Sequence, residues 1–172
     1  YPTVRLFVVA RESRIAFGVR PAPVWAFVAG YLAAWSVVGL PAYALLSAVP
    51  MGMFEPRLKG LALVVAGLYQ LTPWKRTCLS HCRSPLLFLT HAWRDGRLGA
   101  ILMGAHHGAY CVGCCWGLML VLLVLGVMEV GWMVAVAAVV FVEKVLPGGP
   151  RIGRALGALL LAAGAAVALG LR

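Results

Sequence analysis

The sequence predicts an all-α, polytopic helical membrane protein, and three observations lead to that fold class. Hydrophobic residues make up 63% of the 172 residues and charged residues only 12%, whereas soluble domains are roughly half apolar and a quarter charged. The mean hydropathy is +0.94. The apolar residues gather in long runs that are separated by basic connections. These features predict a single integral membrane domain over residues 1–172, seated in a lipid bilayer.

Five apolar segments are candidates for transmembrane helices, each of which needs about 20 residues. They are residues 23–48, 58–71, 105–128, 131–146 and 152–171. A kink is expected at Pro41 in the first segment, and the sequence Pro147-Gly-Gly-Pro150 predicts a helix end after the fourth. The chain begins with Tyr1 rather than Met, and we expect a further amino-terminal helix that precedes this sequence.

The connection over residues 72–104 is the longest between the predicted spans. Its middle, residues 85–93 (PLLFLTHAW), is apolar on one face, which predicts an interfacial helix lying in the membrane surface. Basic residues concentrate in the amino-terminal arm, in this connection and around Arg151. Since basic loops stay on the cytoplasmic side, we expect these three segments there. The net charge of +10 therefore indicates basic loops near anionic lipid, with no nucleic-acid partner.

All five cysteines and all four histidines of the chain lie between residues 78 and 115. The cysteines are Cys78, Cys82, Cys111, Cys114 and Cys115, and the histidines are His81, His91, His106 and His107. The two groups stand at opposite ends of the long connection, and both ends of such a connection return to the same face of the membrane. We therefore expect the two groups to form half-sites that close on one metal ion.

The spacing in the second group indicates a shared helix face. If a helix begins near Gly104, then His107, Cys111, Cys114 and Cys115 stand at positions i, i+4, i+7 and i+8, which lie on one face. Thiolate and imidazole ligands suit Cu⁺ or Zn²⁺ better than iron. A helix amino terminus would also lower the pKa of these thiols. The predicted ligands are thus Cys78, Cys82, Cys111 and Cys114, with His107, His81 and Cys115 as alternates; for Cys115 a packing role is the competing interpretation.

Other polar and aromatic side chains occur at membrane depth. Glu143 is expected either to pair with a cation at the interface beside Lys144 or to accept the N–H of a ligand histidine. Tyr69 and Gln70 are expected to form hydrogen bonds between helices. Trp116 follows Cys115 directly, and we expect it to shield the site from water.

Three stretches resemble a known family. Residues 67–85 (GLYQLTPWKRTCLSHCRSP), 104–119 (GAHHGAYCVGCCWGLM) and 142–149 (VEKVLPGG) resemble the bacterial and archaeal family of predicted metal-binding integral membrane proteins, a domain of unknown function. The resemblance covers nearly the whole chain. It implies a prokaryotic cytoplasmic membrane, metal binding and a further helix before Tyr1.

Three functions fit these observations. The first is transition-metal handling, with copper or zinc held by a Cys/His site at the cytoplasmic face of the membrane. The second is a thiol–disulfide oxidoreductase linked to quinone, in which Cys111 and Cys114 form a C-x-x-C pair and Cys78 and Cys82 a shuttle pair. The third is an accessory subunit of a respiratory or photosynthetic complex. No motif for hydrolytic or phosphoryl chemistry occurs, so the sequence leaves open whether the protein is an enzyme.

Overall fold

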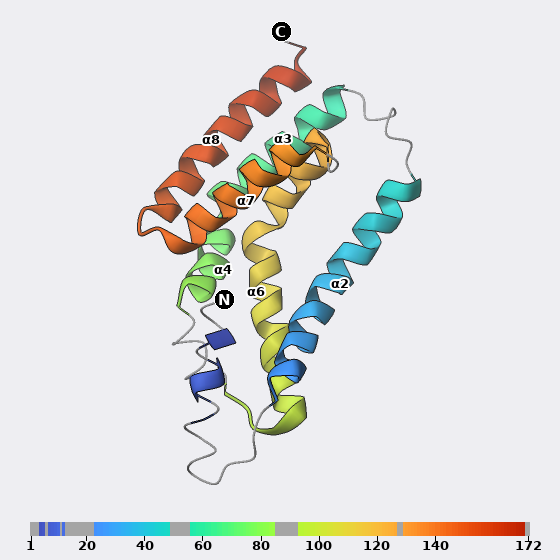
Figure 1. The fold of residues 1–172 in the computed structure, drawn as a ribbon. Helices are drawn as coiled ribbons and strands as arrows, with labels where there is room; N and C mark the ends of the chain where they lie inside the picture. Colours follow the sequence, from blue (N-terminus) through green and yellow to red (C-terminus); the bar gives the residue numbers. More distant parts are fainter. Residues whose placement is uncertain are drawn as a thin grey trace. The chain divides into compact units, whose positions relative to one another are not determined.

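The computed structural model describes residues 4, 5, 7–10, 12, 23–48, 56–84, 93–126 and 129–170, and every regular element in this part of the chain is helical (Figure 1). The helices are α2 (Val24–Ala48), α3 (Pro56–Leu71), α4 (Pro73–Arg83), α6 (Gly96–Leu125), α7 (Val130–Val145) and α8 (Gly149–Ala168). The all-α fold class is therefore confirmed for the described residues.

Three helices are long and apolar enough to cross a membrane. They contain the candidate spans Val24–Leu45, Gly96–Leu125 and Gly149–Ala168. Helices α3 and α7 have 16 residues each, which is short of the roughly 20 residues that a straight span needs. The prediction of five transmembrane helices is thus not confirmed. Most of the predicted interfacial helix, residues 85–92, lies outside the described residues.

The helix boundaries follow the apolar runs closely, with one exception. Helix α7 ends at Val145, ahead of Pro147 as predicted, and α8 begins at Gly149. Helix α6, in contrast, begins at Gly96 rather than near residue 105, and Gly96 has a φ of +77° that only glycine adopts readily. The long connection is correspondingly shorter than predicted, and it also contains α4, which carries Cys78 and Cys82.

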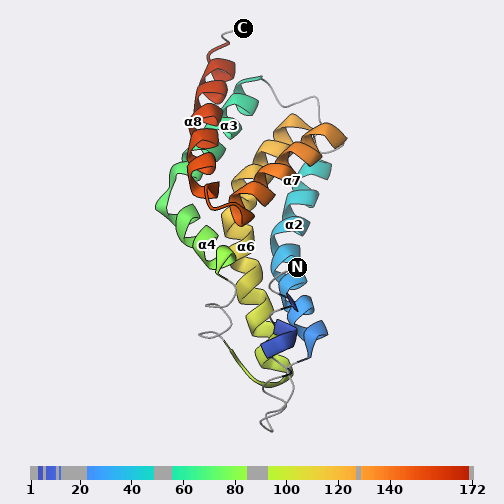
Figure 2. The ribbon, with the colours of Figure 1, turned by 60° about the vertical axis from the view of Figure 1, so that its left-hand side comes forward.

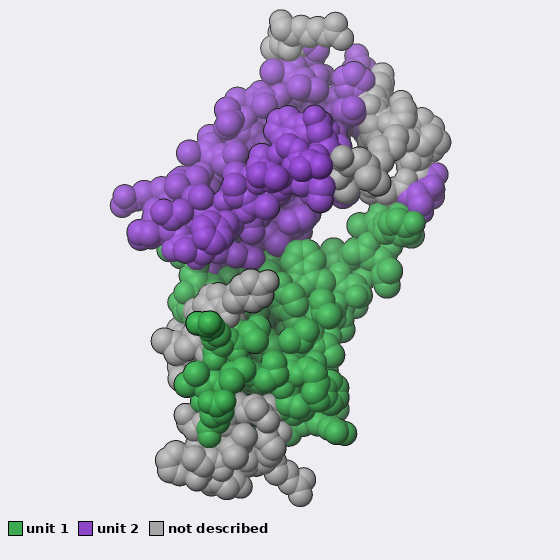
Figure 3. All heavy atoms as spheres, in the orientation of Figure 1, with its two compact units in different colours: residues 1–44, 80–112 green, residues 45–79, 113–172 purple. Residues whose placement is uncertain are grey.

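The described chain divides into two compact units (Figure 3). Unit 1 comprises Tyr1–Ala44 and Ser80–Val112, and unit 2 comprises Leu45–Leu79 and Gly113–Arg172. In unit 1, α2 and the first part of α6 approach closely, because a Cβ at Gly104 would collide with the carbonyl oxygen of Phe27. A small aromatic core that includes Phe7 and Phe27 packs beside this contact.

Unit 2 is built around the pair α3 and α8, which run side by side (Figures 1 and 2). A Cβ at Gly60 of α3 would lie 2.7 Å from the carbonyl oxygen of Gly164 in α8, and a Cβ at Gly67 would lie 2.8 Å from that of Gly157. Small residues at these positions let the two backbones touch, as in membrane helix pairs. Leu63 and Ala66 of α3 pack with Val121 of α6 on the other side.

Candidate metal centre

The His/Cys face predicted from spacing is present on α6. Because residues 96–125 form one continuous helix, His107, Cys111, Cys114 and Cys115 lie on a common face. These four side chains are all buried, Cys114 and Cys115 with only 2% of their surface exposed, whereas the neighbouring His106 is exposed. Helix α6 thus carries His107 and Cys111 one turn apart in unit 1 and the adjacent Cys114 and Cys115 in unit 2.

The expected thiolate activation at a helix amino terminus is wrong. Helix α6 begins at Gly96, so Cys111 and the cysteines beyond it lie in the middle of the helix. The favourable field of a helix terminus acts only over the first turn. The helix amino terminus therefore does not stabilise a thiolate at these positions.

The predicted ligands divide between the two units. His81, Cys82, His107 and Cys111 belong to unit 1, and Cys78, Cys114 and Cys115 belong to unit 2. All five cysteines lie in described residues and carry thiols rather than disulfides. Among the residues that the structure describes, no group of three or more His, Cys, Asp or Glu side chains has an arrangement that could hold a metal ion.

Within unit 2, the thiol of Cys78 lies against the helix that carries Cys114. The Cys78 sulfur is 2.8 Å from the position that a Cβ would take at Gly113 of α6. Glycine at 113 thus leaves the space that the sulfur occupies, directly next to Cys114 in the chain. Cys78 is half-buried and Cys114 fully buried, so this pair joins a partly accessible thiol to an enclosed one.

The surroundings of Cys78 favour its protonated form. Burial raises the pKa of the Cys78 thiol above its ordinary value of 9.0, and the negative charge that Cys114 can carry raises it further. This mutual effect within unit 2 means that the two sulfurs resist being thiolates together unless a cation lies near them. A bound metal ion supplies such a cation.

Tyr69 fixes α3 to the same turn of α6. Its hydroxyl donates a hydrogen bond to the carbonyl oxygen of Gly113, and its ring lies 4.5 Å from the ring of Trp116, centroid to centroid. The predicted interhelical hydrogen bond of Tyr69 is thus confirmed. Trp116 packs against Tyr69, so it helps to hold the backbone beside the cysteines.

Within unit 1, His107 and Cys111 face α2. The ring of His107 lies 6.2 Å from the rings of both Phe27 and Tyr31, and the Tyr31 hydroxyl is 3.3 Å from the Cys111 sulfur. Tyr31 therefore contacts two predicted ligands one helical turn apart. Its contact with Cys111 is 80 residues distant in the sequence, and the spacing pattern gave no signal for it.

His81 also lies in an aromatic setting in unit 1. Its ring stacks on that of Tyr110, with centroids 4.2 Å apart and an interplanar angle of 2°, and His106 meets the same Tyr110 ring edge-on at 4.9 Å. Cys82 follows His81 on α4 and is half-buried. Stacking on Tyr110 therefore covers one face of the His81 ring and fixes its plane.

Sequence reasoning missed a buried ion pair in unit 2. The Lys75 ammonium lies 2.7 Å from Oε2 of Glu143 and 2.8 Å from Oε1. Gln70 contacts both partners, since its amide donates to Glu143 at 3.0 Å and its carbonyl oxygen accepts from Lys75. The cation that pairs with Glu143 therefore comes from α4. The hydrogen bond of Gln70 between helices is confirmed.

Comparison with known proteins gives one family. A family model described as "PpoB2: Copper chaperone" matches residues 1–167. No curated protein and no solved structure matches the chain. The family match covers both cysteine groups and all the described helices except the end of α8.

Proposed function

The chain belongs to the PpoB2 family, which is described as copper chaperones, and from that premise we propose that it is a membrane protein that binds Cu⁺ through cysteine thiolates and passes it on. The observation that carries the proposal is the contact of the Cys78 sulfur with Gly113, the residue that precedes Cys114 in the chain. Copper is the cargo in this proposal, and the protein is its carrier.

The chemistry of the side chains supports copper in its reduced form. Soft thiolate ligands select Cu⁺, which accepts linear coordination by a pair of sulfurs, whereas structural Zn²⁺ is almost always tetrahedral. We propose Cys78 and Cys114 as such a pair within unit 2, since the Cys78 sulfur lies against Gly113, and Cys115 is the next thiol along the helix. His107 and Cys111 in unit 1 offer a mixed imidazole–thiol pair one turn apart on α6.

The difference in burial supports transfer by ligand exchange. Cys78 and Cys82 on α4 are half-buried, whereas Cys111, Cys114 and Cys115 on α6 are buried. A donor could pass Cu⁺ to a thiol of α4, and the ion would move to a thiol of α6 by exchanging one sulfur at a time. Each exchange keeps the ion bound to sulfur, so it is never released into water.

The exposed apolar surface supports a place in the membrane. Helices α3 and α7 expose Leu61, Leu68, Val134 and Phe141 by more than half of their surface, which suits lipid rather than water. We keep the proposal that these shorter helices also cross the bilayer, tilted or in a thinned membrane. We further propose that the site lies at the cytoplasmic face of a prokaryotic cytoplasmic membrane, and the basic connections support the cytoplasmic side.

The test is a metal measurement on the full chain. The protein would be purified anaerobically in detergent, titrated with Cu⁺ and analysed by elemental mass spectrometry. We expect near-stoichiometric copper in the parent and a loss of at least about tenfold in affinity, or roughly 1.4 kcal/mol, in Cys78→Ser and in Cys114→Ser. Ser80→Ala removes a hydroxyl from α4 but alters no cysteine, so this variant should bind Cu⁺ with the parent's affinity.

Two other outcomes would decide against this function. Copper binding that persists in both serine variants would place the site elsewhere. A parent protein that binds no copper and isolates with its cysteines joined as disulfides would support the thiol–disulfide oxidoreductase instead.

A further inference from the structure

Unit 2 contains a buried network of three polar side chains that copper binding by thiols does not by itself require. Lys75 on α4, Gln70 on α3 and Glu143 on α7 meet there, and the side chains of Lys75 and Glu143 are only 3% and 2% exposed. The ammonium donates to both carboxylate oxygens and to the Gln70 carbonyl oxygen. A lysine ammonium has three N–H donors, so all of them are engaged.

Stability alone does not account for this network. Removing two charges from water costs several kcal/mol for each ion, and a well-packed apolar replacement is often as stable as a buried ion pair. Charged residues at membrane depth are correspondingly rare and mark functional positions. The fold nevertheless makes room for the pair, because a Cβ at Gly153 of α8 would lie 2.8 Å from Oε1 of Glu143.

The network lies next to the thiols of unit 2. Lys75 precedes Cys78 by one turn of α4, so the two side chains project from neighbouring positions on one face. Burial lowers the pKa of Lys75, while Glu143 and, more weakly, Cys114 and Cys115 act in the opposite direction. Lys75 thus shares unit 2 with thiols whose negative charge would favour its ammonium form.

A copper–thiolate complex needs a positive charge at this place. Two thiolates that bind one Cu⁺ carry a net charge of −1, and a third thiolate would make it −2. Such an anion is costly in a buried site, and no other lysine or arginine of the described residues in unit 2 is buried. An ammonium that is already desolvated and fixed stabilises the complex without further reorganisation.

We propose that Lys75, held in place by Glu143 and Gln70, is a positioning residue that supplies the positive charge for a Cu⁺–thiolate complex at Cys78 and Cys114. This inference rests on the proposed copper function. It adds that the affinity for Cu⁺ depends on the charge at residue 75, and that Glu143 competes with the thiolates for that charge.

The competition gives a test that separates charge from structure. Lys75→Met and Glu143→Gln both break the ion pair, and both should lower the thermal unfolding midpoint. Their effects on Cu⁺ affinity should differ. Lys75→Met should lower it by at least about tenfold, whereas Glu143→Gln leaves the ammonium to the thiolates and should keep or raise it. The affinity would be measured by competition with a chromogenic Cu⁺ chelator, on full-length protein in detergent.

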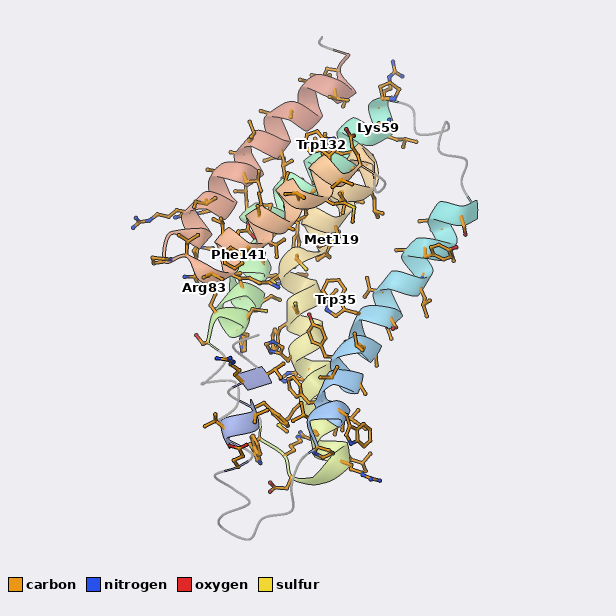
Figure 4. All side chains as sticks on the ribbon, viewed as in Figure 1. Trp35, Lys59, Arg83, Met119, Trp132 and Phe141 are labelled. Carbon is orange, nitrogen blue, oxygen red and sulfur yellow. The ribbon has the colours of Figure 1, made fainter. Side chains whose placement is uncertain are left out.

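Further variants serve as controls. Lys59→Met makes the same chemical change at an exposed lysine of α3 (Figure 4) and should change the affinity by less than about twofold, since exposed charges are screened. Lys75→Arg keeps the charge and should retain the parent's affinity. In Lys75→Met/Glu143→Gln both charges are absent. The thermal unfolding midpoint should therefore recover relative to the single variants, while the Cu⁺ affinity stays low.

The outcomes are distinguishable. Equal losses of affinity in Lys75→Met and Glu143→Gln would overturn the proposal, because a purely structural ion pair predicts them. A folded double variant with the parent's affinity would overturn it as well. A parent that binds no Cu⁺ would refute the proposed function itself, and this inference would fall with it.

Discussion

The hydroxyl of Tyr31 lies 3.3 Å from the sulfur of Cys111, which links α2 to the buried thiol face of α6 within unit 1. A thiol is a weak partner for a hydroxyl, whereas a thiolate is a charged acceptor and binds it more strongly. The contact should therefore strengthen when Cys111 loses its proton.

Tyr31→Phe is expected to remove this contact while keeping the ring. We expect a loss of about 1 kcal/mol in stability, the usual net value of one hydrogen bond, and slower alkylation of Cys111, because the hydroxyl that favours its reactive thiolate is gone. Thermal unfolding and peptide mapping after alkylation would measure the two effects. Tyr43→Phe is the matched control on α2, because the Tyr43 side chain is 73% exposed; identical behaviour of the two variants would contradict the role of Tyr31.

Gly113→Ala should separate copper binding from folding. The added Cβ would lie 2.8 Å from the Cys78 sulfur, and a sulfur at the end of a side chain can move aside. Stability should therefore change little, or gain up to about 1 kcal/mol from alanine in a helix, while Cu⁺ affinity falls by about tenfold or more. Gly131→Ala on α7, with nothing within 4 Å of the added Cβ, should leave the affinity unchanged. An equal affinity in Gly113→Ala would show that the position of the Cys78 sulfur does not matter.

The raised pKa of Cys78 predicts a pH dependence. Since the folded state holds the Cys78 proton more tightly than the unfolded state does, this group's contribution to stability is complete below pH 9.0 and is lost as the pH rises through the folded-state pKa. Alkylation of Cys78, followed by mass spectrometry, should reach half of its maximal rate above pH 9.0. In Cys114→Ser that midpoint should fall, because one cause of the raised pKa is gone. A midpoint below pH 9.0 in the parent protein would contradict the effect of burial.

Hydropathy predicted the helices because long apolar runs indicate segments that avoid water, either in the protein core or in lipid. The alignment of His107 with Cys111 on one face of α6 followed from their spacing alone. The start of α6 was missed because Arg94, Asp95 and Arg97 suggested a loop, although Leu98 and Ile101 already continue the apolar run. The charged residues stand in the first turn or just before it, so the helix extends further than hydropathy alone indicates.

The pairings between helices could not be predicted in the same way. Lys75 and Glu143 are 68 residues apart, and each alone is compatible with a solvated charge or an interfacial one. Nothing in a local pattern identifies which cation reaches a given acid across a helix bundle. The same holds for Gly113. Its lack of a side chain matters because the Cys78 sulfur occupies the space beside it.

The contact of α3 with α8 should be the part of unit 2 least tolerant of added volume. A Cβ at Gly60 would meet backbone atoms, with the Gly164 carbonyl oxygen at 2.7 Å and the Ala168 Cα at 2.8 Å, and backbone cannot rotate away as a side chain can. Gly60→Ala is therefore expected to force the helices apart and to cost about 1–3 kcal/mol, more than alanine gains in helix propensity. Gly39→Ala in α2 has nothing within 4 Å of its added Cβ and should be neutral or stabilising. Far-ultraviolet circular dichroism during heating in detergent would compare the two, and a Gly60→Ala protein as stable as Gly39→Ala would show that the helices do not pack this closely.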